Sequence, residues 1–324
     1  MQFTCKIYNP ETRETIWKSI NVTNFVTPPP GLDKRSCKGD PFSITYKSNP
    51  GSEYPESYTI NANLAADLQV LLEVKRPAAI PGYKVGKGPH GGFSYFGADM
   101  EKPDGYVVHR FWPRYEASGH VTHNGRADSV SGPGMLVHAI QGMRPNLVAS
   151  RWNFAHFQSE DASASAIQME FTTCDAYGRS GPGSGGVVVN IGSLVVNGVL
   201  ATVTAETRWP DEEAEAPEAP EAPEVVSRAT PLNVVYDPDT DYHTPNEILF
   251  QWAGPSLLEG ATGMLKAQIT ADLGDVAQPK GLIEKVDVLA EIPYVIKMAV
   301  NYVAGTKPYI YQVLSLSRLA ITPG

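Results

Sequence analysis

One hairpin signal constrains the fold of this chain more than any other feature. Residues 187–196 (VVVNIGSLVV) are mostly apolar and β-branched, the pair Asn197-Gly198 follows, and residues 199–204 (VLATVT) return in the same style. Asn-Gly is the preferred pair for a two-residue hairpin turn, since both positions need a positive φ. We therefore expect two antiparallel strands that are joined at Asn197-Gly198.

Strand-like alternation recurs along the whole chain. In residues 2–8, Phe3, Cys5 and Ile7 fall on one side of the expected strand. A second Asn-Gly pair, at 124–125, predicts another hairpin. Further segments of this kind are residues 15–18, 42–47, 57–61, 68–74, 115–122, 166–173, 231–236, 247–252, 266–271, 281–290 and 309–317. Short strands at such intervals are typical of antiparallel sandwiches and barrels, so we expect a mainly β fold.

The 324 residues, 42% of them hydrophobic, are enough for two domains. We place the boundary at Phe111-Trp112-Pro113, because a proline after two aromatic residues is expected to stop a strand. The expected domains are residues 1–111 and 112–324. Within the second, residues 293–303 predict a short helix, since a proline stands at the start and Gly305 follows the end.

Charge is concentrated in residues 211–224 (DEEAEAPEAPEAPE), which hold seven acids and no base. We expect an extended, disordered insertion there. Of the net charge of −9, seven units belong to this segment, because the other 28 acidic and 26 basic residues nearly balance each other. The sequence has no basic stripe with interleaved aromatics that would favour a nucleic-acid partner. The N-terminus has no secretory signal pattern, so we expect a soluble, cytoplasmic chain with peripheral membrane contact only.

Motifs for catalysis, metals and cofactors give little support to an enzyme. The glycine-rich residues 86–92 lack the Lys-Ser/Thr ending of a phosphate loop, and no Gly-x-Ser-x-Gly elbow occurs. His120 and His123 are three apart, which places them on opposite faces of a strand and makes a zinc site improbable. Three widely spaced cysteines indicate reduced thiols. We therefore expect no cofactor, no metal and no catalytic set. Glu170 lies between Met169 and Phe171 on an expected strand, so we expect it to point away from them and to face solvent.

Residues 134–159 are the best candidate for a binding segment. They combine bulky apolar side chains with histidine, arginine, asparagine and glutamine. An apolar wall with a few placed polar groups is what a small-molecule pocket needs. The same composition would also suit a buried connector, and the sequence leaves both interpretations open.

The chain resembles the fungal survival-factor family, which is lipocalin-like and linked to oxidative-stress survival and sphingolipid handling. The motifs are residues 92–97 (GFSYFG), 109–114 (HRFWPR), 134–159 and 305–312 (GTKPYIYQ). The resemblance implies two lipocalin-like antiparallel domains with a short helix. Family members carry further residues, including an amphipathic membrane-binding helix, ahead of the segment matching Met1, so the first domain is expected to be short at its start.

The resemblance also implies a non-enzymatic carrier of a ceramide-like sphingolipid between the endoplasmic reticulum and the Golgi, with the nucleus as a further location. The expected ligand-binding residues are Trp112, Arg114, His138, Gln141, Trp152, Asn153, Phe157 and Tyr177. Two alternatives stay open. One is a lipocalin-like enzyme of the pericyclase or carotenoid hydratase type, which needs mainly shape and one or two hydrogen bonds; the other is a scaffold whose acidic segment recruits partners.

Overall fold

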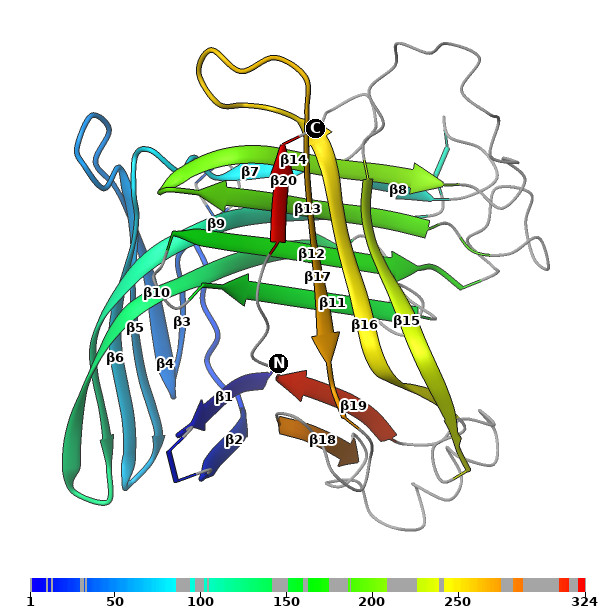
Figure 1. Cartoon of the computed structure of the whole chain (residues 1–324). Coiled ribbons are helices and arrows are strands. Elements are labelled where there is room, and N and C mark those ends of the chain that lie inside the picture. Colours follow the sequence, from blue (N-terminus) through cyan, green and yellow to red (C-terminus); the bar gives the residue numbers. More distant parts are fainter. Residues whose placement is uncertain are drawn as a thin grey trace. The chain divides into compact units, whose positions relative to one another are not determined.

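A computed structural model gives the structure of the chain, and its elements are antiparallel strands. It describes residues 2–9, 11–12, 14–29, 32, 34–85, 94–96, 102–103, 105–141, 151–159, 163–174, 186, 188–208, 226–238, 242–274, 282–287, 309–314 and 320–323. The strands are β1 (Gln2–Tyr8), β2 (Thr15–Asn21), β3 (Cys37–Gly39), β4 (Phe42–Ser48), β5 (Glu56–Ala65), β6 (Leu68–Arg76), β7 (Tyr83–Val85), β8 (Ser94–Phe96), β9 (Gly105–His123), β10 (Arg126–Gln141), β11 (Arg151–Gln158), β12 (Ala164–Thr172), β13 (Val188–Val196), β14 (Val199–Arg208), β15 (Val226–Asp237), β16 (Tyr242–Pro255), β17 (Met264–Asp272), β18 (Leu282–Asp287), β19 (Tyr309–Leu314) and β20 (Ala320–Pro323) (Figure 1).

The predicted fold class, mainly antiparallel β, is confirmed. The predicted helix at 293–303 and the acidic segment 211–224 lie outside the described residues. Within the part of the chain that the structure describes, no helix of membrane-spanning length and apolarity occurs.

The chain forms two compact units. Unit 1 comprises Met1–Lys84 and His109–His138, and unit 2 comprises Val85–Val108 and Ala139–Gly324. The boundary expected at Phe111-Trp112 falls inside β9, which continues through Pro113. The expectation that this proline stops a strand is therefore wrong.

The side chains around Pro113 show how the strand accommodates it. Trp112 packs with Tyr58 at 5.0 Å between ring centroids, and Tyr115 packs against the same cluster. Three positions apart on a regular strand, these two would point to opposite faces. The facing of β9 therefore changes between them, in a segment that contains Pro113, which has no N–H to give to a ladder.

In unit 1, apolar side chains alternate along the strands and share one face. In β1, the residues Phe3, Cys5 and Ile7 point together, as the sequence predicts, and pack on the core formed by β4, β5 and β6. Phe3 lies 4.7 Å from Phe42 between ring centroids. Strands β3–β6, β9 and β10 form one antiparallel sheet in the order β10-β9-β6-β5-β4-β3, and β1 pairs with β2 as a separate hairpin.

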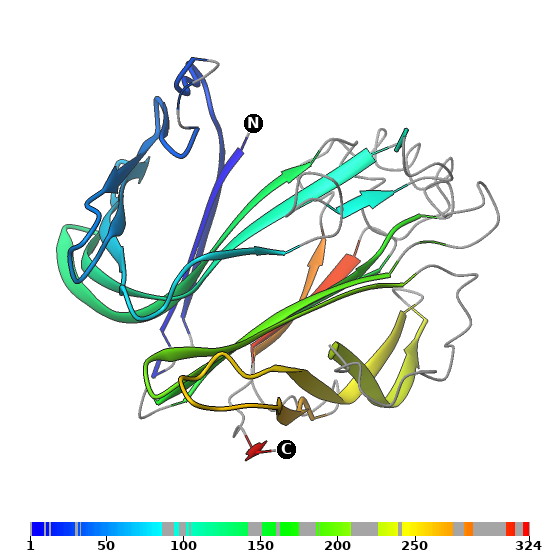
Figure 2. The same ribbon diagram turned by 90° about the horizontal axis from the view of Figure 1, so that it is seen from above.

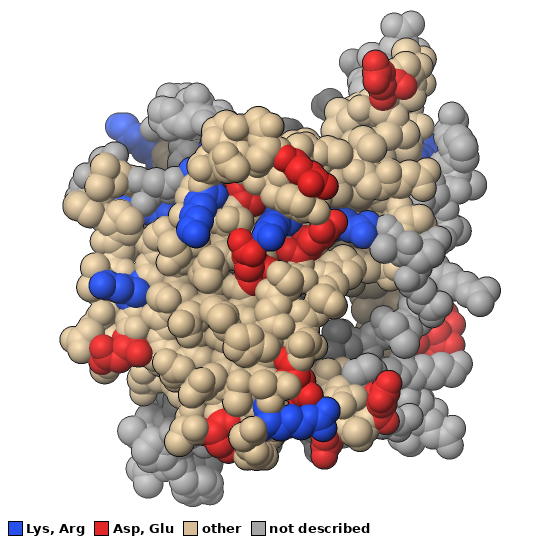
Figure 3. All heavy atoms as spheres, turned by 90° about the vertical axis from the view of Figure 1, so that its left-hand side faces the viewer, with Lys and Arg blue, Asp and Glu red and all other residues tan. Residues whose placement is uncertain are grey.

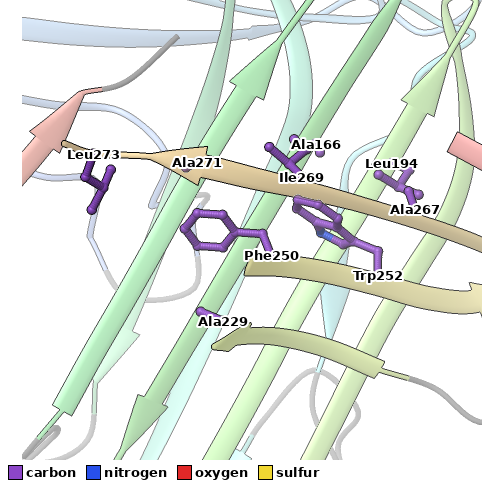
Figure 4. Packing of buried hydrophobic residues seen from close by; sticks show 9 residues of the cluster. All are labelled: Ala166, Leu194, Ala229, Phe250, Trp252, Ala267, Ile269, Ala271 and Leu273. Atoms are coloured by element: carbon purple, nitrogen blue, oxygen red, sulfur yellow. The ribbon is translucent and has the colours of Figure 1, made fainter. Parts of the chain in front are cut away.

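Unit 2 contains two four-stranded sheets, β11-β12-β13-β14 and β15-β16-β17-β20. Figure 2 shows β11–β14 (green) as a curved layer with β15–β17 (yellow to orange) against one of its faces, and in Figure 1 the strands of the two sheets run across one another. Phe250 and Trp252 of β16 fill the space between the sheets, next to Ala166 and Leu194 (Figure 4). The Trp252 indole Nε1 donates to the Ile167 carbonyl at 2.8 Å, so one hydrogen bond fixes the sheets together at the centre of this core.

Both predicted Asn-Gly hairpins are present. The φ angles are 50° and 76° at Asn124 and Gly125, and 50° and 75° at Asn197 and Gly198. Positive φ at both central residues is the geometry that made the pair predictive. The second turn pairs Val196 with Val199, and a register shift between Leu194 and Val195 then brings Gly192 opposite Thr204.

Candidate functional site

The sheet β11–β14 has two faces of different chemistry. Strand alternation places Phe157, Ala166 and Leu194 on the face that packs against Trp252, which we call the core face. The opposite face, which we call the graded face, consists of Phe154, His156, Gln158, Ser165, Ile167, Met169, Phe171, Val189, Ile191, Ser193 and Val195, together with the position of Trp152.

The graded face is apolar at one end. Phe154 pairs with Met169, which pairs with Ile191, and the next row pairs Phe171 with Val189. The four residues on β12 and β13 expose at most 2% of their surfaces, whereas Phe154, on the edge strand β11, exposes 43%. This end offers a continuous wall of thioether, branched aliphatic and aromatic groups.

The graded face is polar at its other end. One row pairs His156 with Ile167 and Ile167 with Ser193, and the next row pairs Gln158 with Ser165. Ser165 and Ser193 each expose 1% of their surfaces, and neither hydroxyl has a hydrogen-bond partner among the described residues. The side-chain nitrogens of Gln158 and His156 approach to 3.2 Å.

His156 adds an uncharged polar group to this end. Its side chain is exposed on the edge strand β11, and desolvation of the imidazole lowers its pKa to about 4, so the ring is neutral at pH 7. Hydroxyl, imidazole and amide groups without a formal charge suit the hydroxyl and amide groups of a neutral lipid head.

The core face carries a polar cluster of its own. The Asn153 amide donates to Glu170 Oε1 at 3.2 Å, and the Asn190 amide, with its nitrogen turned toward both acceptors, donates to Glu170 Oε2 at 2.6 Å and to the Ser227 carbonyl at 2.7 Å. The expectation that Glu170 faces solvent is therefore wrong. Its direction away from Met169 and Phe171 was predicted, but a second sheet covers that side.

The structure divides the predicted site residues between the two units. Trp112 is buried in the unit 1 core at 7% exposure, and Arg114 and His138 lie half-buried in the same unit. In unit 2, Asn153 and Phe157 lie on the core face of β11. Only the backbones of Gln141 and Trp152 are described, and Tyr177 lies outside the described residues.

Alternation within residues 151–158 could have separated this segment into its two faces. Phe154 and His156 share one side, whereas Asn153 and Phe157 share the other. The partners on β12 and β13 could not be predicted in the same way, because strand order and register come from pairing between distant segments. Ser165, Ser193 and Met169 were missed for that reason.

The described residues contain no group of three or more His, Cys, Asp or Glu side chains that could hold a metal ion. Among the described residues, Cys5, Cys37 and Cys174 form no disulfide. Burial raises the pKa of Cys5 and Cys37, which keeps both in the protonated, weakly nucleophilic form.

These features define the chain as a mainly β protein built of antiparallel sheets. The Svf1 family model matches residues 1–323, and the chain belongs to this family. The family resemblance seen in the sequence motifs is thereby confirmed.

Several fungal relatives match nearly the whole chain. The ceramide-binding protein svf1 of Aspergillus fumigatus is 35% identical over 98% of this chain and 67% of its own length. The proteins of the same name from Schizosaccharomyces pombe and Emericella nidulans are each 31% identical, over 100% and 99% of this chain and 72% and 71% of their own lengths. Among solved structures, a putative AttH from Nitrosomonas europaea aligns with a TM-score of 0.45 and 13% identity, over 95% of this chain and 76% of that chain.

Proposed function

We propose that this protein binds a ceramide-like lipid along the graded face of β11–β14. The observation that carries the proposal is the division of that face into an apolar end, around Met169 and Ile191, and an uncharged polar end, around Ser165 and Ser193. Ceramide has the same division, with hydrocarbon chains on one side and an amide with hydroxyls on the other. The names of the fungal relatives support the choice of ligand.

Hydrocarbon burial supplies most of the binding free energy in this proposal. Each methylene group moved out of water contributes about 0.8 kcal/mol, so a chain of ten or more methylenes against the apolar end outweighs the loss of its conformational freedom. The uncharged polar end adds orientation. Lipid carriage needs no catalytic set, in agreement with the motifs of the sequence.

The proposal extends to the cell. We infer that the protein carries its lipid in the cytoplasm between endoplasmic reticulum and Golgi membranes, which it meets peripherally, and that this transport supports survival under oxidative stress. The family resemblance supports this extension. If the purified protein transfers no ceramide between vesicles of the two membrane compositions, this extension is wrong, whether or not the protein binds ceramide.

Binding is tested by mass spectrometry of organic extracts from the purified protein, with titration of added ceramide. The variant Phe154→Glu places a charge on the apolar end at an edge-strand position that already exposes 43% of its surface, so folding should survive. Phe25→Glu is the matched control, because Phe25 exposes 39% and lies in unit 1. We expect stoichiometric lipid in the native protein and the control, and at least a tenfold weaker affinity in Phe154→Glu.

Two outcomes would overturn the proposal. One is a native protein that carries no lipid and binds no added ceramide. The other is equal ceramide affinity in Phe154→Glu, Phe25→Glu and the native protein, which would separate binding from the graded face.

A further inference from the structure

Two serine hydroxyls are buried on the graded face, at positions where apolar side chains would be expected. Ser165 and Ser193 occupy diagonal positions in neighbouring rows of the graded face, on β12 and β13. Diagonal neighbours of this kind are about 7 Å apart between Cα atoms. Ile167 and Val195 complete the two pairs, so the hydroxyls are framed by aliphatic side chains that cannot hydrogen-bond.

Their burial is costly without a partner. Ser165 and Ser193 each expose 1% of their surfaces, and their hydroxyls have no hydrogen-bond partner within the described ranges. A buried hydroxyl without a partner costs about 1–3 kcal/mol. Alanine would fit the same space without that cost. Buried hydroxyls without a partner also occur on the core face, so the argument for a ligand rests on the position of the two serines in the rows of His156 and Gln158, at the polar end of the graded face.

We propose that Ser165 and Ser193 are the specificity-determining residues of the lipid site, and that they hydrogen-bond to the hydroxyl and amide groups of the lipid head. This inference rests on the proposed function. It fixes the direction of the ligand: the head lies at the end with His156 and Gln158, and the chains run toward Phe171 and Val189. The protein then selects lipids with hydroxyl and amide groups close together over lipids with equal chains and no such groups.

The discrimination follows from the two hydroxyls being buried. A site that hydrogen-bonds a ligand hydroxyl rejects the analogue that lacks it, because its own polar group is then left unpaired. The test compares ceramide with 1-deoxyceramide, which lacks the terminal hydroxyl, and with diacylglycerol of the same chain lengths. Affinities are measured by competition against a fluorescent ceramide for the native protein, Ser165→Ala, Ser193→Ala and the double variant.

Thr202→Val is the matched control. Thr202 is a fully buried hydroxyl without a partner among the described residues, and it pairs with Leu194 on the core face of the same sheet. Ser193→Cys is a second variant that keeps the side-chain size and only weakens the hydrogen bond. Thermal unfolding without ligand is recorded for every variant.

We expect each serine variant to bind ceramide about tenfold more weakly than the native protein, to bind 1-deoxyceramide with nearly native affinity, and to unfold at the native temperature or above it. Thr202→Val should keep the native preference. If the native protein binds ceramide but the serine variants keep its full preference for ceramide over 1-deoxyceramide, this inference is wrong and the proposed lipid binding stands. If the native protein binds none of the three lipids, both fail.

Discussion

At the residue scale, Glu56 shows how this protein satisfies a half-buried carboxylate with its own side chains. The carboxylate accepts from Tyr46 and Arg35 at 2.8 Å through Oε1 and from Arg76 at 2.7 Å through Oε2. Burial alone would raise the pKa of Glu56, but the hydrogen bonds from Tyr46 and Arg76 and the two arginine charges hold it below its usual value. Arg76 also donates to the carbonyls of Pro77 and Ile80, so the network is closed.

Removing this carboxylate should destabilise unit 1. Glu56→Ala leaves Arg76 buried without its counter-charge, and we expect the free energy of unfolding to fall by roughly 3 kcal/mol in urea denaturation. Glu73→Ala is the control, because its ion pair with Lys75 at 3.0 Å is exposed. The control should lose less than about 1 kcal/mol. Equal losses in the two variants would contradict the assignment.

His109 gives a prediction for pH. Its side chain is 3% exposed, and burial lowers the pKa of the imidazole to about 4. The imidazole of His109 takes up a proton near pH 6.5 in the unfolded chain and near pH 4 in the folded protein. The free energy of unfolding therefore falls as the pH is lowered from 6.5 to 4, by an amount on the order of 1–3 kcal/mol. His109→Phe should remove this part of the pH dependence of the unfolding free energy. An unchanged pH profile would show that His109 does not carry it.

At the element scale, local sequence patterns predicted the strands and hairpin turns. The predictions that failed depended on which distant segment packs against each strand. Alternation placed Phe3, Cys5 and Ile7 together, and two Asn-Gly pairs located their hairpins. Pro113 did not end β9, which continues through it while Trp112 and Tyr115 pack on one cluster. The packing of Trp112 against Tyr58 joins segments that are distant in the sequence, so no pattern within residues 109–114 predicts it.

The Asn197-Gly198 turn can be tested directly. Gly198 has a φ of 75°, a backbone conformation that residues with a Cβ adopt at a cost of about 1 kcal/mol. We expect Gly198→Ala to lower the free energy of unfolding by that amount. Gly198→Asn should lose less, since asparagine tolerates this region. A larger loss for Asn than for Ala would mean that the turn contributes through something other than backbone conformation.

At the scale of the whole molecule, the site residues predicted from contiguous sequence fall into two units. Trp112, Arg114 and His138 lie in unit 1, whereas Asn153 and Phe157 lie in unit 2. Closeness along the chain told us which segments are rich in suitable groups. It could not show which side chains converge, because Ser165 and Ser193 meet the 151–158 strand only through the register of β12 and β13.

The surface adds a further observation at this scale. On the face that Figure 3 turns toward the viewer, acidic and basic side chains are interspersed and much of the area carries neither. A neutral lipid as ligand needs no field of one sign to steer it. Binding should therefore change little between low and physiological salt, and a titration of ceramide at both ionic strengths checks this. A steep loss of affinity with salt would indicate a charged ligand.

The most direct test of the central claim is photo-crosslinking with a ceramide that carries a diazirine in its acyl chain, followed by mass spectrometry of the peptides. We predict adducts on β11, β12 and β13, concentrated near Phe154 and Met169 at the apolar end of the graded face. Adducts confined to residues 1–84 and 109–138 would contradict the account and would move the site to unit 1, where Trp112, Arg114 and His138 lie.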